Sequence, residues 1–207
     1  MGTLQVGGTT LATKNVSTGK VDLSTNYRPP PGGVIEQFMS PCDGSSITVQ
    51  SGTYTVQNVT SGQNLTTSYT TLNGSLIDYT PPSGTQTVIY NFNFQYSYAD
   101  AHNIAHIRLY LDNDSGTETE VTDAKVSLGA ESYHEGKYSL KWAFHIGGSN
   151  NDATGRRSSW SSARTIQLKV REYSGTSESS MNVVNYWDGS GSQFILTKPL
   201  IGITALG

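Results

Sequence analysis

The stretch YNFNFQYSY, residues 90–98, decides the fold class of this chain. Its aromatic side chains alternate with amides and one serine, so they lie on one face of an extended strand and the polar side chains lie on the other. We expect the aromatic face to be the core side of a β-sandwich, because large rings stabilise most when they are buried. An oligomer axis lined by tyrosines is the alternative interpretation of the same face.

The same period of two recurs along the chain. Residues 107–111, 138–146 and 166–170 alternate in this way, and shorter candidates lie at 46–50, 53–58, 65–70, 120–128, 181–186 and 193–197. Gly- or Pro-bearing turns separate them, and no segment longer than ten residues carries a helical stripe. About ten short strands of this kind predict an all-β, antiparallel β-sandwich, with a jelly-roll order favoured over other sandwiches. The order of the strands cannot be read from their spacing.

Composition limits the classes of function. Only 14% of the 207 residues are charged and the net charge is -3, so no basic field attracts nucleic acid. The single Cys42 excludes an intrachain disulfide. The first residues lack the cationic start and apolar core of a signal peptide, and no run approaches the ~18 apolar residues of a membrane span. We therefore expect assembly in a host cytoplasm without membrane insertion, and a polar surface of the kind that virion components carry.

A stiff junction divides the chain. In NYRPPPGGVIEQF, residues 26–38, Pro29, Pro30 and Pro31 favour an extended rod, whereas Gly32 and Gly33 allow a change of direction. The residues before the junction contain too few apolar side chains to fold alone. We predict an extended N-terminal arm with its linker at residues 1–31 and a β-sandwich domain at residues 32–207.

The N-terminal segment resembles a known group of proteins. The segment LQVGGTTLATKNVSTGKVDL (4–23), followed by the Pro/Gly step and GVIEQF (33–38), is similar to the start of tail-fibre-like structural proteins of marine tailed bacteriophages. The resemblance covers residues 3–38. The rest of the chain shares the general look of trimeric jelly-roll heads on viral fibres and of the C1q/TNF group. The resemblance implies that the arm anchors to the virion and that the distal domain is displayed.

The anchor would use the apolar side chains of the arm, held by neighbouring chains as added strands or in a small stem. An arm that folds back onto its own domain is the alternative. The anchoring residues would be Leu4, Val6, Leu11, Val16, Val21 and Leu23.

Residue patterns for catalysis or metal binding are weak. His102, His106, His134 and His145 lack a spacing that brings them together, so we expect solvated or turn histidines. Residues 112–116, DNDSG, begin like a calcium loop but lack its later glutamate, and a hairpin turn is favoured. No nucleophile motif occurs and no paired carboxylates stand out. We predict no enzyme, no catalytic or metal-binding residue and no cofactor; a depolymerase with carboxylates from distant strands is the alternative.

Two polar segments are candidates for surface binding. Residues 148–162 and 185–193 combine aromatic rings with charged groups, which suits a sugar because a ring face meets C–H groups while polar groups meet hydroxyls. The favoured alternative for the two tryptophans is packing under their loops or between subunits. The candidate binding residues are Arg156, Arg157, Trp160, Tyr186, Trp187 and Asp188.

Together these features predict a phage virion structural protein, a surface fibre or spike used for display or host attachment. The alternatives are a capsid decoration or cement protein and, less favoured, a glycan-degrading virion enzyme. Expected partners are copies of the chain, with a trimer favoured, other virion proteins through the arm, and a host-surface glycan. The apolar run at residues 200–206 would be a last strand or a subunit contact. The sequence names neither the receptor nor the site on the capsid or tail.

Overall fold

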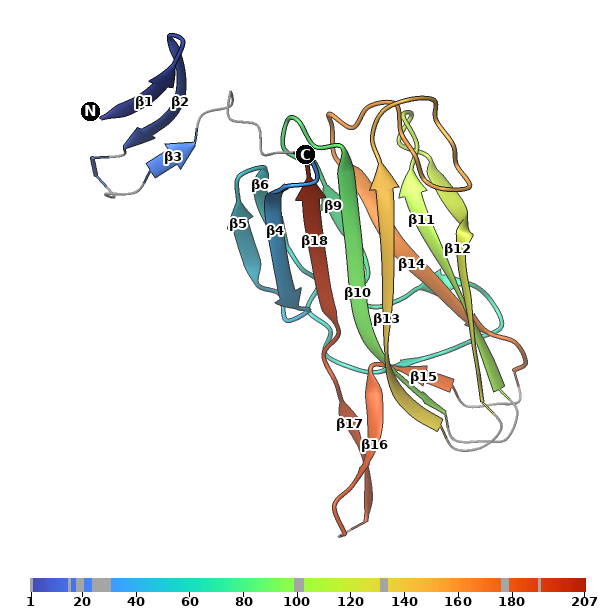
Figure 1. Ribbon diagram of the computed structural model, residues 1–207. Coiled ribbons are helices and arrows are strands. Elements are labelled where there is room, and N and C mark those ends of the chain that lie inside the picture. Colours follow the sequence, from blue (N-terminus) through green and yellow to red (C-terminus); the bar gives the residue numbers. More distant parts are fainter. Residues whose placement is uncertain are drawn as a thin grey trace.

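The structure is a computed structural model that describes residues 2–14, 16–17, 21–23, 31–98, 103–130, 134–175, 179–189 and 191–207. Every regular element in these ranges is a β-strand, and most of the strands pair in two facing sheets (Figure 1). The all-β class and the antiparallel sandwich expected from the sequence are confirmed. The described residues contain no helix that is long and apolar enough to cross a membrane.

One sheet contains both ends of the sandwich domain. Its four main strands lie in the order β4 (Val34–Pro41), β18 (Leu200–Leu206), β10 (Thr87–Tyr98) and β13 (His134–His145). Beyond the end of β18, the short strand β15 (Ser179–Met181) also pairs with β10, and β7 (Gln63–Asn64) pairs with β15. The apolar run at residues 200–206 is thus the last strand. It lies inside the sheet, where β4 and β10 cover its two edges.

The second sheet faces the first. Its strands lie in the order β12 (Glu118–Ala130), β11 (Asn103–Asp112) and β14 (Arg164–Glu172), and both β9 (Ile77–Tyr79) and β8 (Thr70–Thr71) pair with the far side of β14. If β4, β9, β10, β11, β12, β13, β14 and β18 are counted one to eight along the chain, the two sheets have the orders 1-8-3-6 and 2-7-4-5. This interleaving of two Greek keys is the jelly-roll order.

The aromatic face of β10 forms the centre of the core. Tyr90, Phe92, Phe94 and Tyr96 are all buried, and the ring centroids of Phe92 and Phe94 lie 5.8 Å apart. The Tyr90 hydroxyl donates to the Ser75 carbonyl at 2.7 Å, which gives this buried polar group a partner. Inward residues of β11 and β14 cover the rings from the other sheet. The interpretation of this face as core is confirmed, and the interpretation as an oligomer axis is wrong.

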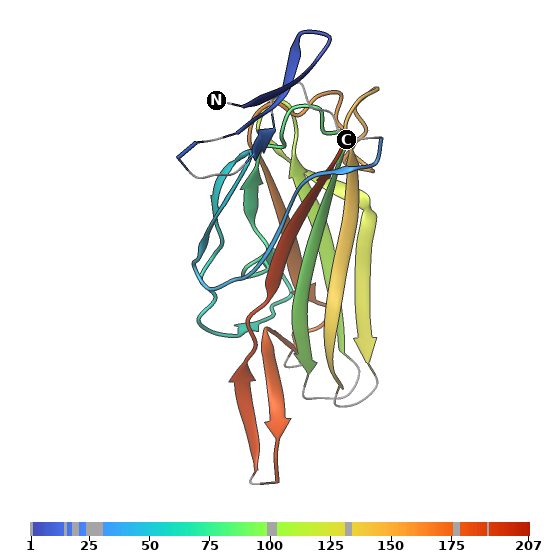
Figure 2. The same cartoon turned by 60° about the vertical axis from the view of Figure 1, so that its left-hand side comes forward.

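Two hairpins extend the sandwich. β5 (Ser46–Val49) and β6 (Gly52–Thr55) pair beside β4, where Tyr54 stacks on Phe38 with centroids 5.5 Å apart. β16 (Val183–Trp187) and β17 (Ser192–Leu196) pair at the opposite end and project from the sandwich (Figure 2). The second hairpin connects directly to β18, so its base is fixed by the sheet.

The expected extended arm forms a small sheet of its own instead. β1 (Thr3–Val6), β2 (Thr9–Lys14) and β3 (Val21–Leu23) pair antiparallel in that order. The reason is the Gly7-Gly8 pair, whose φ angles of 57° and 81° suit the tight two-residue turn that matches strand twist. Among the described residues, no strand of this sheet pairs with a strand of the sandwich.

Candidate functional site

The loop at residues 148–162 packs over one end of the sandwich. Trp160 is only 5% exposed. Its indole N–H donates to the Tyr79 carbonyl at 3.0 Å, and its ring meets the Phe144 ring edge-on with centroids 5.9 Å apart. The interpretation of Trp160 as a surface binding residue is therefore wrong, because the core offers both apolar area and a partner for the indole N–H. The alternative, packing under its loop, is confirmed for this residue.

Arg157 also points inward, which corrects the expectation that it lies on the surface. Its backbone N–H donates to the His145 carbonyl at 3.1 Å, and its carbonyl accepts from the Gly147 N–H at 2.8 Å. These contacts turn the side chain under the loop, where it is 1% exposed and donates to Asp152 Oδ1 at 2.7 Å. Arg156, the preceding residue, stays exposed.

The turn at residues 112–116 fastens the same loop. Asp114 accepts from the guanidinium of buried Arg164 and, at 2.7 Å, from Asn150 Nδ2 in the loop. The Asp112 carbonyl accepts from Arg164 Nη1 at 2.9 Å. An arginine thus lies against the oxygens that a calcium ion would need, which favours the hairpin-turn interpretation. In the described ranges, no three or more His, Cys, Asp or Glu side chains gather in a way that could hold a metal ion.

The Asp114 contact predicts a pH dependence. Hydrogen bonds from Arg164 and Asn150 hold the pKa of Asp114 below its ordinary 3.8. A carboxylate with a lowered folded-state pKa stabilises the fold above its ordinary pKa, and this contribution is lost as the pH falls toward the lowered value. We expect Asp114→Asn to lower the Tm at pH 7, and we expect the difference from wild type to shrink between about pH 4 and pH 2. Thermal unfolding from pH 7 to pH 2 measures this, and a difference that stays constant would contradict it.

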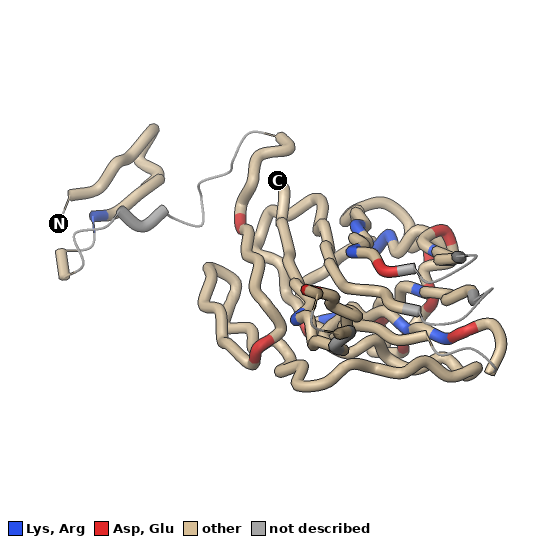
Figure 3. Tube along the Cα trace, turned by 90° about the horizontal axis from the view of Figure 1, so that it is seen from below, with Lys and Arg blue, Asp and Glu red and all other residues tan. Residues whose placement is uncertain are grey.

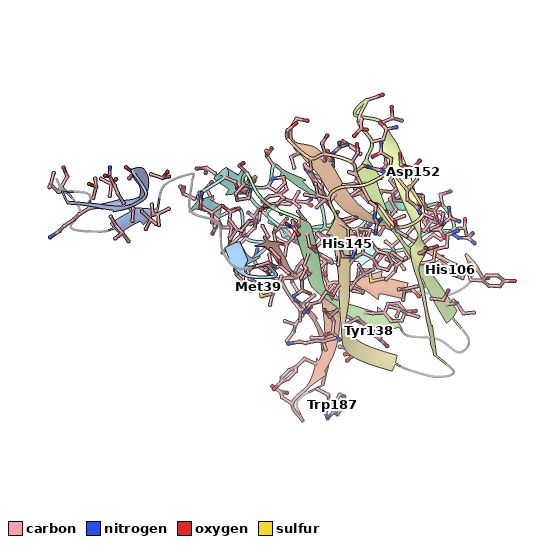
Figure 4. All side chains as sticks on the ribbon, turned by 45° about the horizontal axis from the view of Figure 1, so that its top comes forward. Met39, His106, Tyr138, His145, Asp152 and Trp187 are labelled. Carbon is pink, nitrogen blue, oxygen red and sulfur yellow. The ribbon has the colours of Figure 1, made fainter. Side chains whose placement is uncertain are left out.

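The histidines that the structure describes do not converge. His106 lies on the sheet of β11, where partial burial and the neighbouring Arg171 and Arg108 lower its pKa. His145 lies on β13 of the other sheet, with Nδ1 3.2 Å from Thr87 Oγ1 (Figure 4). His102 and the side chain of His134 lie outside the described residues.

The projecting hairpin carries the exposed aromatic surface. Trp187 is 68% exposed and Phe194 is 69% exposed, and Tyr186 is also exposed. Trp187 pairs with Ser192, and Asn185 pairs with Phe194, so Trp187 and Phe194 are diagonal neighbours on one face while Tyr186 lies on the other. Figure 4 shows Trp187 at the far end of the molecule. Asp188 follows in the exposed turn.

Sequence reasoning missed Phe194 and Ile195, which add exposed apolar area to this hairpin. The signal was present, because two short strand-like runs, 181–186 and 193–197, flank a turn rich in Gly and Ser. Pairing these runs would have placed Phe194 beside Trp187. The base of the hairpin is held by the Asn185 N–H, which donates to Glu135, and by the Thr197 N–H, which donates to the Asn182 carbonyl at 2.9 Å.

The two candidate segments lie at opposite ends of the sandwich. The hairpin connects to the start of β18 at Leu200. The loop at 148–162 contacts the end of β13, where His145 pairs with Thr87, and Thr87 pairs with Leu206 at the other end of β18. Arg156 and Trp187 therefore cannot form one site, and the hairpin alone remains as the candidate binding surface.

The N-terminal sheet presents a second exposed apolar surface. Leu4, Val6 and Val16 are exposed, Leu11 is half-buried, and Ala12 is buried between its neighbouring strands. The side chains of Val21 and Leu23 lie outside the described residues, as do Pro29 and Pro30. Pro31 is exposed and precedes Gly32 and Gly33. The Gly32 N–H donates to the Gly207 carbonyl, and the Gly207 N–H donates to the Gly33 carbonyl. The chain from the arm thus enters the sandwich at the end opposite the hairpin.

Comparisons with known proteins give weak likenesses. No family model and no curated protein matches the chain. A structure of infectious bursal disease virus, Gx strain, has a TM-score of 0.36 at 5% identity, covering 84% of this chain and 40% of that one. Eiger TNF from S. frugiperda has a TM-score of 0.28 at 16% identity, covering 86% of this chain and 89% of that one. This chain spans less than half the length of the first, and the assignment of the fold rests on the strand order alone.

Proposed function

We propose that this chain is a phage virion structural protein, a surface fibre or spike that displays a jelly roll anchored through its N-terminal sheet. The observation that carries the proposal is the position of two exposed apolar elements at opposite ends of one sandwich. The chain from the arm enters beside Gly207, and the β16–β17 hairpin projects at the other end (Figure 1). Such a molecule is built to be held at one end and to make contact at the other.

The arm needs a partner for physical reasons. Three short strands without a packed face bury too little apolar surface to be stable alone in water. Leu4 and Val6 are exposed on β1, and among the side chains of this sheet that the structure describes only Ala12 is buried. Cover from other virion proteins would remove these side chains from water, which is the role that the resemblance of residues 3–38 implies.

The hairpin suits contact with a host-surface glycan. Trp187 and Phe194 provide flat aromatic area on one face, which matches the C–H groups of a pyranose. The neighbouring Asp188 and the polar side chains of the turn match sugar hydroxyls. The turn itself is polar, so insertion into a lipid layer would bury groups that need water.

We also propose that the chain is not an enzyme and needs no cofactor. The carboxylates with described contacts are engaged in structural pairs: Glu36 accepts from Ser51 and Tyr79, and Glu120 lies within ion-pair distance of Arg108. A capsid decoration or cement protein is the second candidate, because an exposed arm and an exposed hairpin could also join two particle proteins.

Deleting residues 1–31 tests the anchor. We expect the truncated chain to keep its β-sheet circular dichroism, because no strand of the small sheet pairs with the sandwich among the described residues. It should be absent from particles assembled in its presence, whereas full-length chain carrying Trp187→Ala should be incorporated. Particle composition by mass spectrometry measures this.

The outcomes separate the candidates. Loss of β-sheet signal would show that the arm belongs to the fold, and truncated chain inside particles would place the anchor elsewhere; either result contradicts the proposal. Particles that lack the chain but stay intact and adsorb poorly to cells support a fibre or spike. Particles that become fragile but adsorb normally support a cement protein.

A further inference from the structure

The two outer faces of the sandwich differ in charge. The outer face of β11, β12 and β14 is covered by ion pairs, such as Arg108–Glu120 at 2.9 Å and Lys125–Glu120 at 3.1 Å. Lys169 reaches across from β14 to Glu118 and also lies 4.7 Å from the ring centre of Tyr110. In Figure 3 the charged residues gather over one side of the sandwich, and the side near β4 is mostly uncharged. The charged face is adapted to water.

The opposite outer face is neutral over three strands. Strand register places its outward residues in three rows across β4, β18 and β10. None of the nine positions carries a charge, and charged residues follow on β13, at Lys141, Lys137 and Glu135. The rows are Gln37–Thr204–Ile89, Met39–Gly202–Asn91 and Pro41–Leu200–Asn93.

Most of the exposed apolar residues lie in three parts of the chain: the arm, the strands β4 and β18 of the neutral face, and the hairpin. Among the residues that the structure describes, thirteen large apolar side chains are exposed. Three lie in the arm, three on β4 and β18, and four on the projecting hairpin, which leaves only three elsewhere. Figure 4 shows Met39 on the side of the sandwich between the N-terminal sheet and the hairpin that carries Trp187.

We infer that copies of this chain associate side by side through the neutral face of β4, β18 and β10. A face that meets copies of itself around an axis brings identical side chains together, so charges there would repel. A neutral face avoids this repulsion, whereas a charged partner would need charges of opposite sign on this face. Met39 is 52% exposed and its methyl group lies over Gly202, so an apolar side chain occupies the middle of the face and is available to pack against a neighbouring copy.

The orientation of the copies rests on the proposed function. Anchoring to one particle surface puts every arm at the same end, so the copies lie parallel around one axis, and a trimer is the closed assembly that we expect from the sequence. The small sheets then gather at one end and the aromatic hairpins at the other. Several hairpins side by side would raise the avidity for a repetitive host surface without new contacts.

Light scattering on the purified full-length chain tests the association. We expect wild type to have about three times the 22.3 kDa chain mass at micromolar concentration. Met39→Lys places a charge in the middle of the neutral face and should raise the dissociation constant at least about tenfold. Val126→Lys, at an exposed apolar position of β12 on the other sheet, is the matched control and should keep the wild-type mass.

Cross-linking gives a second readout that does not depend on affinity. Gln37→Cys should give covalently linked chains with a short bis-maleimide, and Gln167→Cys on the charged face should not. Wild-type Cys42 does not interfere, because burial raises the pKa of its thiol to about 12. A monomeric wild type, or a Met39→Lys variant that keeps the wild-type mass with no Gln37→Cys linkage, overturns the inference. Failure of the arm-deletion test alone would contradict the anchor and leave this association in place.

Discussion

Replacing Trp160 by alanine is expected to lower the free energy of unfolding by about 3–5 kcal/mol, the usual cost of removing a large aromatic side chain from a packed core. The side chain is almost completely buried and contacts Phe144 edge-on. Its removal also leaves the Tyr79 carbonyl without the indole N–H at the end of β9. In a chain of this length the Tm should fall by roughly 10 °C, which thermal unfolding followed by circular dichroism measures.

Trp187→Ala is the matched control for this variant. Its indole is mostly exposed, so the Tm should change little, while adsorption of particles to cells should fall if the hairpin makes the host contact. A small effect of Trp160→Ala would contradict the packing described for the loop. A large loss of stability in Trp187→Ala, with normal adsorption, would assign the hairpin to subunit packing.

The fold could be predicted from the sequence because the strongest signal lies in its centre. A strand with aromatic side chains at every second position has one stable place, the middle of a sandwich, and β10 takes that place with Tyr90 to Tyr96. The strand order could not be predicted in this way. It depends on which edges meet after collapse, and β18, the last strand, lies between β4 and β10.

The candidate site was only partly predictable for a related reason. Trp160 and Trp187 occur in similar polar surroundings in the sequence, yet one is buried and the other is exposed. The difference between them arises from tertiary structure. Residues 148–162 fold back over the end of the core, where Arg157 and Arg164 hold the loop. The hairpin, by contrast, has no sheet beside it along most of its length. Local polarity does not encode that difference.

The N-terminal sheet shows the opposite case, in which a local signal was sufficient. Gly7-Gly8 stands between two short runs that contain apolar residues, which is the pattern of a two-residue hairpin. The extended arm was expected because the whole segment is too small to be stable alone. Both observations hold together, since the hairpin forms and its apolar side chains still lack cover.

Glu36 is a buried carboxylate that no sequence pattern indicated. It lies on the inward face of β4, and its oxygens accept from the Ser51 hydroxyl at 2.6 Å, the Ser51 N–H at 2.8 Å and the Tyr79 hydroxyl at 2.9 Å. Burial and the neighbouring Glu36 charge raise the pKa of Tyr79 well above its ordinary range, so its phenol remains a donor. The carboxylate thereby joins β4, the β5–β6 turn and β9.

Glu36→Ala should therefore lower the free energy of unfolding by about 3 kcal/mol, because it leaves the buried Tyr79 hydroxyl and the half-buried Ser51 N–H without an acceptor, at about 1–3 kcal/mol for a fully buried group. Glu36→Gln keeps the volume and one acceptor oxygen, so its loss should be smaller, although its amide N–H groups then face other donors. Gln37→Ala, at the exposed neighbouring position, should change the free energy by less than about 0.5 kcal/mol. Urea unfolding of the three variants decides the matter: equal stability of Glu36→Ala and Gln37→Ala would show that the carboxylate does not hold the two sheets together at this edge.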